Sequence, residues 1–213
     1  MPTQRRRSTG WADRRRDSYH HGDLKRALTD AALALVAEKG PKGFSLSEAA
    51  RRAGVSVAAP YRHFADKAQL LAAVAEQGFT QLHEALTTAG DSISDPKNRV
   101  IELAQAYVRW AVGHPDYYQV MFGVETIKAE HPGLLLAAAR AFDDLLDAIT
   151  GCQELRMMRG LDPREIAAPM WSLVHGIASL AISGDLHHVG IQEDPAALTT
   201  RAVADWLKIG ESP

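Results

Sequence analysis

Apolar residues recur along this chain at intervals of three and four positions, the spacing that aligns side chains on one face of an α-helix. Residues 23–39 show it most clearly, with apolar side chains at Leu24, Ala27, Leu28, Ala31 and Leu35. Similar patterns and helix-start signals predict further helices over 46–53, 57–63, 67–87, 97–112, 117–122, 133–157, 163–183 and 195–208. Neither strand-like alternation nor an internal repeat interrupts this pattern, which therefore predicts an all-α fold.

Residues 43–70 carry the most specific local signals. Ser45 and Glu48 match the S-x-x-E pattern of a capping box, in which each side chain satisfies the backbone N–H of the other residue. Gly54 stands where the helix over 46–53 needs a left-handed residue at its end, and Ser56 can cap the next helix. Two short helices joined by a glycine-containing turn are the layout of a helix-turn-helix, which places its second helix in the major groove of DNA.

The sequence of this segment resembles a known family. Gly54-Val55-Ser56, followed by Tyr61-x-His63-Phe64-x-x-Lys67-x-x-Leu70, resembles the DNA-binding domain of the TetR family of bacterial transcription regulators. The resemblance implies an N-terminal three-helix helix-turn-helix DNA-binding domain, joined to a C-terminal helical domain for ligand binding and dimerisation. We therefore expect a disordered basic arm over 1–19, the DNA-binding domain over 20–66, and the effector-binding and dimerisation domain over 67–213. Pro60 departs from many members and leaves the start of the 57–63 helix open.

Several residues of this segment are candidates for DNA contact. The methyl groups of Val57, Ala58 and Ala59 could make apolar contacts with thymine methyl groups. The guanidinium of Arg62 could donate hydrogen bonds to two acceptors on a base or phosphate. The resemblance adds phosphate contacts by Tyr61, His63 and Lys67, and by Ser45 and Ser47 at the start of the preceding helix. Ser56, the expected helix cap, is a further candidate for DNA contact. Phe64 is expected in the core. Packing of Tyr61, and a plain surface role for His63, are the alternatives.

The charge distribution supports a nucleic-acid module in the first third of the chain. Residues 1–67 hold 14 Lys and Arg against 7 Asp and Glu, whereas the remainder holds 10 against 19. A basic segment on an acidic body is the electrostatic pattern of a DNA-binding domain attached to another function. The arginines of 5–7 and 14–16 lie in the predicted arm, where they either contact phosphates or are simply solvated.

The second half is rich in aromatic and flexible apolar side chains on predicted helices. Such side chains line ligand pockets, although each one alone also suits an ordinary core. The candidate ligand-binding residues are Trp110, Tyr117, Tyr118, Met121, Phe122, Phe142, Trp171 and His175. The resemblance favours a pocket, because the body helices of TetR-type regulators enclose an effector site. Trp171-x-x-x-His175-Gly176 also resembles a Trp-His-Gly type of C-terminal domain. His175 offers a ligand a polar group, or else is a core histidine.

A stripe of small residues predicts close packing against a second helix. Ser172, Gly176, Ser179 and Ser183 share one face of the 163–183 helix, with Leu173, Ile177 and Leu180 beside them. Together with the last helix (Leu198, Ala202, Val203 and Trp206) this face suits a two-fold dimer contact, as in the family. A two-fold dimer would match a palindromic operator in double-stranded DNA.

The remaining observations limit the class of protein. No apolar run reaches the length of a membrane span, no secretory leader is evident, and the single Cys152 suits a reducing cytoplasm. We find no catalytic motif and expect no cofactor, no metal and no enzymatic activity. Together with these observations, the resemblance implies a cytoplasmic, homodimeric repressor released from DNA by a small-molecule effector. The alternatives are a DNA-binding dimer with a filled core and, remotely, a helical metal-dependent enzyme using His175, His187 or His188.

Overall fold

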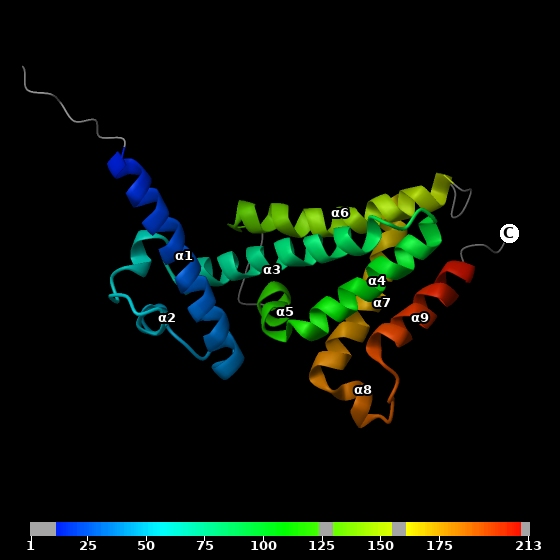
Figure 1. The fold of residues 1–213 in the computed structure, drawn as a ribbon. Helices are drawn as coiled ribbons and strands as arrows, with labels where there is room; N and C mark the ends of the chain where they lie inside the picture. Colours follow the sequence, from blue (N-terminus) through cyan, green and yellow to red (C-terminus); the bar gives the residue numbers. More distant parts are fainter. Residues whose placement is uncertain (1–11, 124–129, 155–160, 210–213) are drawn as a thin grey trace, which may run out of the picture. The chain divides into compact units, whose positions relative to one another are not determined.

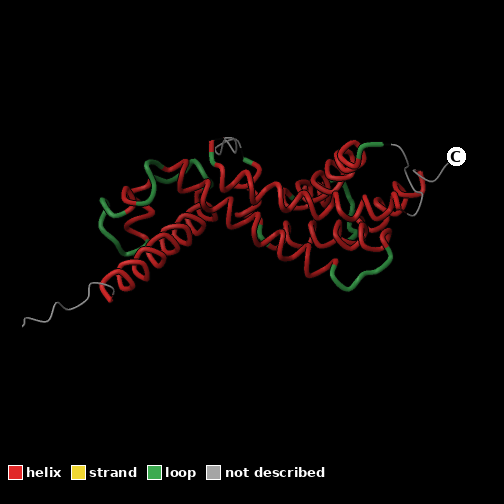
Figure 2. The backbone as a smooth tube through the Cα atoms, turned by 90° about the horizontal axis from the view of Figure 1, so that it is seen from above, coloured by secondary structure: helices red, strands yellow, loops and turns green. Residues whose placement is uncertain are grey.

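The computed structural model describes residues 12–123, 130–154 and 161–209. Throughout these ranges the regular structure is helical and contains no strand (Figure 2), as the periodicity predicted. The chain divides into two compact units, Met1–Leu71 and Ala72–Pro213. The division falls inside one helix, a few residues after the predicted boundary at its start. We call the two units the head and the body and describe each by itself.

The head contains α1 (Ala12–Lys39), α2 (Leu46–Arg52), the 3₁₀ turn η1 (Pro60–Arg62) and the first residues of α3 (Lys67–Gly90). Its core includes apolar side chains of α1, α2 and α3 and of the loop after η1, among them Leu28, Leu35, Ala49, Leu70 and Phe64. The predicted core position of Phe64 is confirmed, because its side chain is buried. The periodicity of the 23–39 segment thus located the buried face of α1.

The N-terminal bound of α1 corrects the sequence-based prediction. The predicted arm over 1–19 is wrong for residues 12–19, which lie in α1, whereas its residues 1–11 lie outside the described part of the chain. An existing helix extends at little cost, since each added residue gains one hydrogen bond and no new nucleus is needed. A polar segment without apolar periodicity can therefore be helical, and the pattern did not reveal this.

The body is built from the rest of α3 together with α4 (Pro96–Gly113), α5 (Pro115–Phe122), α6 (Pro132–Glu154), α7 (Pro163–Ser183), α8 (Asp185–His188) and α9 (Pro195–Ile209) (Figure 1). Helix α4 packs against α6, α7 and α9, and α7 also contacts α6, α8 and α9. Helices α4 and α7 are thus the central pair of the body.

Aspartate caps fix where α3, α7 and α9 begin. Asp66 Oδ1 accepts a hydrogen bond from the Gln69 N–H at 2.9 Å, and Asp162 Oδ1 accepts one from the Arg164 N–H at 2.8 Å. Asp194 Oδ1 accepts from both Ala196 and Ala197 at 3.0 Å. An aspartate followed by proline supplies both a side-chain cap and a first helical residue that needs no N–H partner. The helix starts that the sequence predicted at residues 67, 163 and 195 are confirmed.

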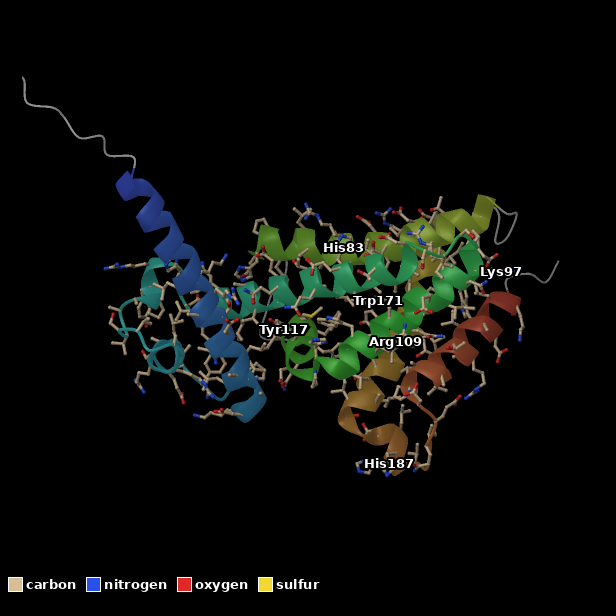
Figure 3. All side chains as sticks on the ribbon, viewed as in Figure 1. His83, Lys97, Arg109, Tyr117, Trp171 and His187 are labelled. Atoms are coloured by element: carbon tan, nitrogen blue, oxygen red, sulfur yellow. The ribbon has the colours of Figure 1, made fainter. Side chains whose placement is uncertain are left out.

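His187 and His188, named above as possible metal ligands, lie in the short helix α8. Figure 3 shows His187 at the end of the body that α8 forms, away from Trp171. Among the described residues, no three His, Cys, Asp or Glu side chains lie close enough together to hold a metal ion.

Helix α7 has an unusual composition. Of the helices in the described ranges, it alone has the length and apolar character that could cross a membrane. One face of α7 is buried against other body helices, including Ile166, Met170, Val174 and Ala178. Elsewhere on α7, Leu180 and the small residues Ser172 and Ser179 are exposed. Helix α7 is thus a central helix of the body that also has an uncovered face.

Candidate DNA interface and body cavity

The turn between α2 and η1 has the geometry that its glycine predicted. Gly54 adopts the left-handed conformation with φ of 72°, which a side chain would disfavour. The Val55 N–H bonds to the Ala50 carbonyl at 3.0 Å and the Gly54 N–H to the Arg51 carbonyl at 3.1 Å, closing the end of α2. At the other end, the Ser45 Oγ accepts the Glu48 N–H at 3.2 Å, as the capping box predicted.

The second helix of the predicted motif is shorter than expected. Residues 57–59 form turns, and only Pro60–Arg62 are helical, in the 3₁₀ form. Proline has no N–H, so the i to i−4 bond from residue 60 to Ser56 cannot form. The Ala59 N–H instead bonds to the Ser56 carbonyl at 2.9 Å, three residues back. The predicted 57–63 α-helix is therefore wrong, and so is its Ser56 side-chain cap, since Ala59 is the N-cap and makes no such bond.

The side chains predicted to contact DNA lie mostly on the surface of the head. Tyr61 and Val57 are 59% and 48% exposed. Ser45, Ser56, Ala58 and Arg62 are also exposed, whereas Ser47, Ala59, His63 and Lys67 are half-buried. Within the described part of the chain Arg62 makes no ion pair, unlike Arg52, whose guanidinium bonds both Glu38 carboxylate oxygens at 2.5 and 2.6 Å. A guanidinium that is exposed and unpaired is available to an external acceptor.

Lys67 has a structural role that the sequence did not reveal. Its Nζ donates to the carbonyl oxygens of Phe44 at 3.0 Å and Lys42 at 3.3 Å. The same ammonium lies 5.0 Å from the centre of the Phe44 ring, within the range of a cation–π interaction. Lys67 therefore fastens the first turn of α3 to the loop that precedes α2.

The body encloses a cavity of about 530 Å³. Its wall is almost entirely apolar, with side chains from α3, α4, α5, α6 and α7: Phe79, Leu82, Leu86, Leu103, Ala104, Tyr107, Phe122, Ala138, Ala141, Phe142, Leu145, Arg164, Ala168, Met170, Trp171 and Val174. Phe142 and Trp171 meet edge to face, with ring centres 6.1 Å apart. A cavity of this volume and polarity has the character of a small-molecule site.

A polar cluster supports one side of the cavity wall. His175 Nδ1 lies 3.0 Å from the Tyr107 hydroxyl and 2.8 Å from the Tyr118 hydroxyl, which also donates to the His175 carbonyl at 3.1 Å. The His175 ring packs on Phe122 and Trp171, at centre distances of 4.6 and 5.6 Å. Burial raises the pKa of Tyr118 to about 12 and that of Tyr107 further still, so both hydroxyls stay protonated at neutral pH.

Comparison with known proteins decides the family. The model described as "Tetracyclin repressor-like, C-terminal domain" matches residues 100–206, and the model for bacterial regulatory proteins of the tetR family matches residues 28–74. The chain belongs to the TetR family. It is accordingly a transcription regulator with a helix-turn-helix DNA-binding domain, in a family whose members bind DNA and dimerise.

Individual relatives agree with this assignment. The HTH-type transcriptional regulator BetI of Rhizobium meliloti is 34% identical over 85 residues, which cover 40% of this chain and 42% of BetI. The chain thus matches less than half of that relative's length. A protein of unknown function from Rhodococcus sp. RHA1 superposes with a TM-score of 0.78 at 32% identity, covering 91% of this chain and 98% of that one. FadR of Bacillus subtilis, solved with stearoyl-CoA, shares the fold at 18% identity with a TM-score of 0.71, over 88% of this chain and 99% of FadR.

In this TetR-family body the predicted ligand-binding residues separate into two groups. Phe122, Phe142 and Trp171 line the cavity, and Figure 3 shows Trp171 on α7 among the body helices. The others lie outside the described lining: Trp110, Tyr117, Tyr118, Met121 and His175. Trp110 stacks on His114 at a centre distance of 4.9 Å, and the Tyr117 hydroxyl accepts a bond from Gln81 at 3.2 Å. These side chains join helices to one another, and Tyr118 and His175 pack against the lining residue Phe122.

Sequence reasoning missed the aliphatic part of the wall. Phe79, Leu82 and Leu86 recur at three- and four-residue spacing on α3, the signal of any buried helical face. Tyr107 and Arg164 add polar groups to the lining and stand in no recognisable motif. Periodicity can show that a face is buried, but only the packing of five helices shows that it borders an empty volume.

Proposed function

We propose that this TetR-family protein is a homodimeric, cytoplasmic repressor that an apolar small molecule releases from a palindromic operator. The cavity is the observation that carries the proposal. Small-molecule sites are typically concave, largely apolar volumes of about 300–1,000 Å³, and the cavity of about 530 Å³ lies within that range. A body that served only for dimerisation would be expected to have a filled core, because protein interiors are close-packed.

The fold of a solved relative supports the same interpretation. FadR of Bacillus subtilis shares this fold and was solved in complex with stearoyl-CoA. The identity of 18% limits that likeness to the fold. It supports a small molecule as the effector of this chain without naming the molecule.

Helix α3 offers a route from the cavity to the DNA-binding elements. Its first residue, Lys67, is bonded to the loop before α2, and its later residues Phe79, Leu82 and Leu86 line the cavity. An effector that binds better to a DNA-incompetent arrangement of α3 lowers operator affinity by the difference in its affinity for the two states. At the operator, η1 and the start of α2 would supply the contacts, with Arg62 as the reading side chain.

The proposed dimer uses the uncovered face of α7 together with α9. Ser172, Ser179 and Ser183 are exposed there, and a Cβ atom added at Gly176 would meet no atom within 4 Å. Leu180 is 45% exposed on the same helix. A partner helix could approach these small residues closely, as the two-fold contact requires.

A ligand screen with a filled-cavity control tests the proposal. Ala141→Phe places a ring in the cavity, whereas Ala139→Phe adds the same ring to the exposed face of α6. Thermal unfolding is measured with a panel of apolar carboxylic acids, alcohols and polycyclic aromatic compounds. We expect at least one compound to stabilise the wild type and Ala139→Phe but not Ala141→Phe, and to dissociate the protein from DNA selected out of a random pool. Stabilisation that is equal in all three proteins, or absent in all, contradicts an effector site in this cavity.

A further inference from the structure

The charge distribution of the cavity wall is uneven. Among the described lining residues, Arg164 alone carries a charge, and no carboxylate lies beside it in that lining. The hydroxyl of Tyr107 is already engaged with His175. Among the described residues, a ligand in the cavity therefore meets a largely apolar wall with one charged group, the Arg164 guanidinium.

Arg164 is placed to meet the end of a bound molecule. Its side chain is exposed to solvent and also lines the cavity, so it stands where the cavity opens. The guanidinium makes no ion pair within the described part of the chain, although exposed pairs such as Arg201–Glu193 at 2.6 Å form elsewhere in the body. Asp162 accepts the backbone N–H of Arg164 but makes no ion pair with its side chain. The donors of Arg164 thus remain available.

From this arrangement we infer that the effector is an amphipathic organic anion, with an apolar body in the cavity and a single carboxylate-like group on Arg164. The inference rests on the proposed effector function of the cavity and specifies its ligand class. An arginine binds a carboxylate through two parallel N–H···O bonds, which are stronger than bonds between neutral groups. The apolar wall rejects a second charge because burying an unpaired ion is costly.

The wall also limits the shape of the ligand body. Phe122, Phe142 and Trp171 present ring surfaces, while Leu86, Leu103 and Leu145 present aliphatic ones. Both alkyl chains and aromatic ring systems suit such a wall, so fatty acids and aryl carboxylic acids share the chemistry that the site requires. A short acid such as butyrate would leave most of the volume of about 530 Å³ unfilled.

Calorimetric titration with matched probes tests the inference. Decanoate, its uncharged analogue decanol, butyrate and 2-naphthoate are titrated into the wild type, Arg164→Gln, Arg164→Lys and Arg140→Gln. Decanoate is also titrated into the filled-cavity variant Ala141→Phe. Arg140 is an exposed arginine on α6 outside the cavity lining, so its variant is the matched control. We expect decanoate or 2-naphthoate to bind the wild type and Arg140→Gln, and Arg164→Gln to weaken that binding about tenfold. Arg164→Lys should restore part of the affinity, and decanol should bind all four proteins alike.

The outcomes separate this inference from the proposed function. If decanol binds as tightly as decanoate and Arg164→Gln changes neither, the anion inference is overturned while the apolar effector cavity stands. Decanoate binding that Ala141→Phe leaves unchanged would place the ligand outside the cavity and contradict both. Failure of decanoate and 2-naphthoate to bind the wild type at millimolar concentration also overturns the anion inference. Whether decanoate or 2-naphthoate binds more tightly then distinguishes alkyl from aromatic bodies.

Discussion

At the residue scale, Arg62 is the side chain on which operator recognition is expected to depend most. It is exposed on η1 and has no ion-pair partner among the described residues. Arg62→Ala should weaken operator binding by about 1–3 kcal/mol and relax the base preference at one position, as loss of a base contact does. Fluorescence anisotropy with labelled operator DNA measures both effects. Arg109→Ala, in the body, is the control that should leave DNA affinity unchanged, and equal affinities for wild type and Arg62→Ala would exclude this residue as a reader.

Lys67 is expected to matter for stability as well as for DNA. The resemblance implied a phosphate contact for Lys67, and in the structure its ammonium is bonded to the Phe44 and Lys42 carbonyls. Lys67→Met should therefore lower the free energy of unfolding by about 1–2 kcal/mol. Urea denaturation followed by circular dichroism measures the change. Lys25→Met, on the exposed side of α1, should have almost no effect, and an equally small effect for Lys67→Met would contradict the anchoring role.

At the element scale, the cluster of Tyr107, Tyr118 and His175 joins α4, α5 and α7 and gives the body a pH dependence. Burial raises the pKa of Tyr118 from 10 to about 12, so the unfolded chain releases this proton at lower pH than the folded one. The stability that this shift contributes is complete below pH 10 and is lost as pH rises towards 12. The free energy of unfolding should fall across this window in the wild type and less steeply in Tyr118→Phe. Identical slopes in urea titrations of the two proteins would rule out this linkage.

Helix α7 carries the expected dimer contact. Gly176→Leu or Ser179→Leu adds bulk to a face where two helices should approach closely, and overpacking of this kind costs about 1–3 kcal/mol. Sedimentation equilibrium should show both variants shifted towards monomer, while Glu84→Leu on the exposed side of α3 stays dimeric. Unchanged association of both α7 variants would place the interface on another element.

The elements also show which parts of the structure could be predicted from sequence. The helices that begin directly after Asp66, Asp162 and Asp194 were located correctly because a side-chain cap is a local interaction. The prediction of an α-helix over 57–63 was wrong because Pro60 has no N–H to donate to an α-helical hydrogen bond, and only a 3₁₀ turn forms there. The cavity residues Leu103 and Ala168 could not be predicted, since an empty volume depends on how five helices pack and not on any one sequence pattern.

At the scale of the whole molecule, one helix takes part in both proposed activities. Lys67 holds the start of α3 to the head, and Phe79 on the same helix lines the cavity of the body. The basic head and acidic body seen in the sequence suit this division, because only the head carries an excess of positive charge for phosphate. Regulation then requires that occupancy of the cavity and binding of DNA change each other's free energy.

The reciprocity of this coupling is the most direct test of the account. A compound selected by the filled-cavity screen is titrated by calorimetry into free protein and into the protein–operator complex, and operator affinity is measured with and without the compound. The account predicts that the compound binds the complex more weakly, by the same factor by which it lowers operator affinity, typically about 5–150-fold. Equal affinity of the compound for free and DNA-bound protein would contradict an effector-controlled repressor.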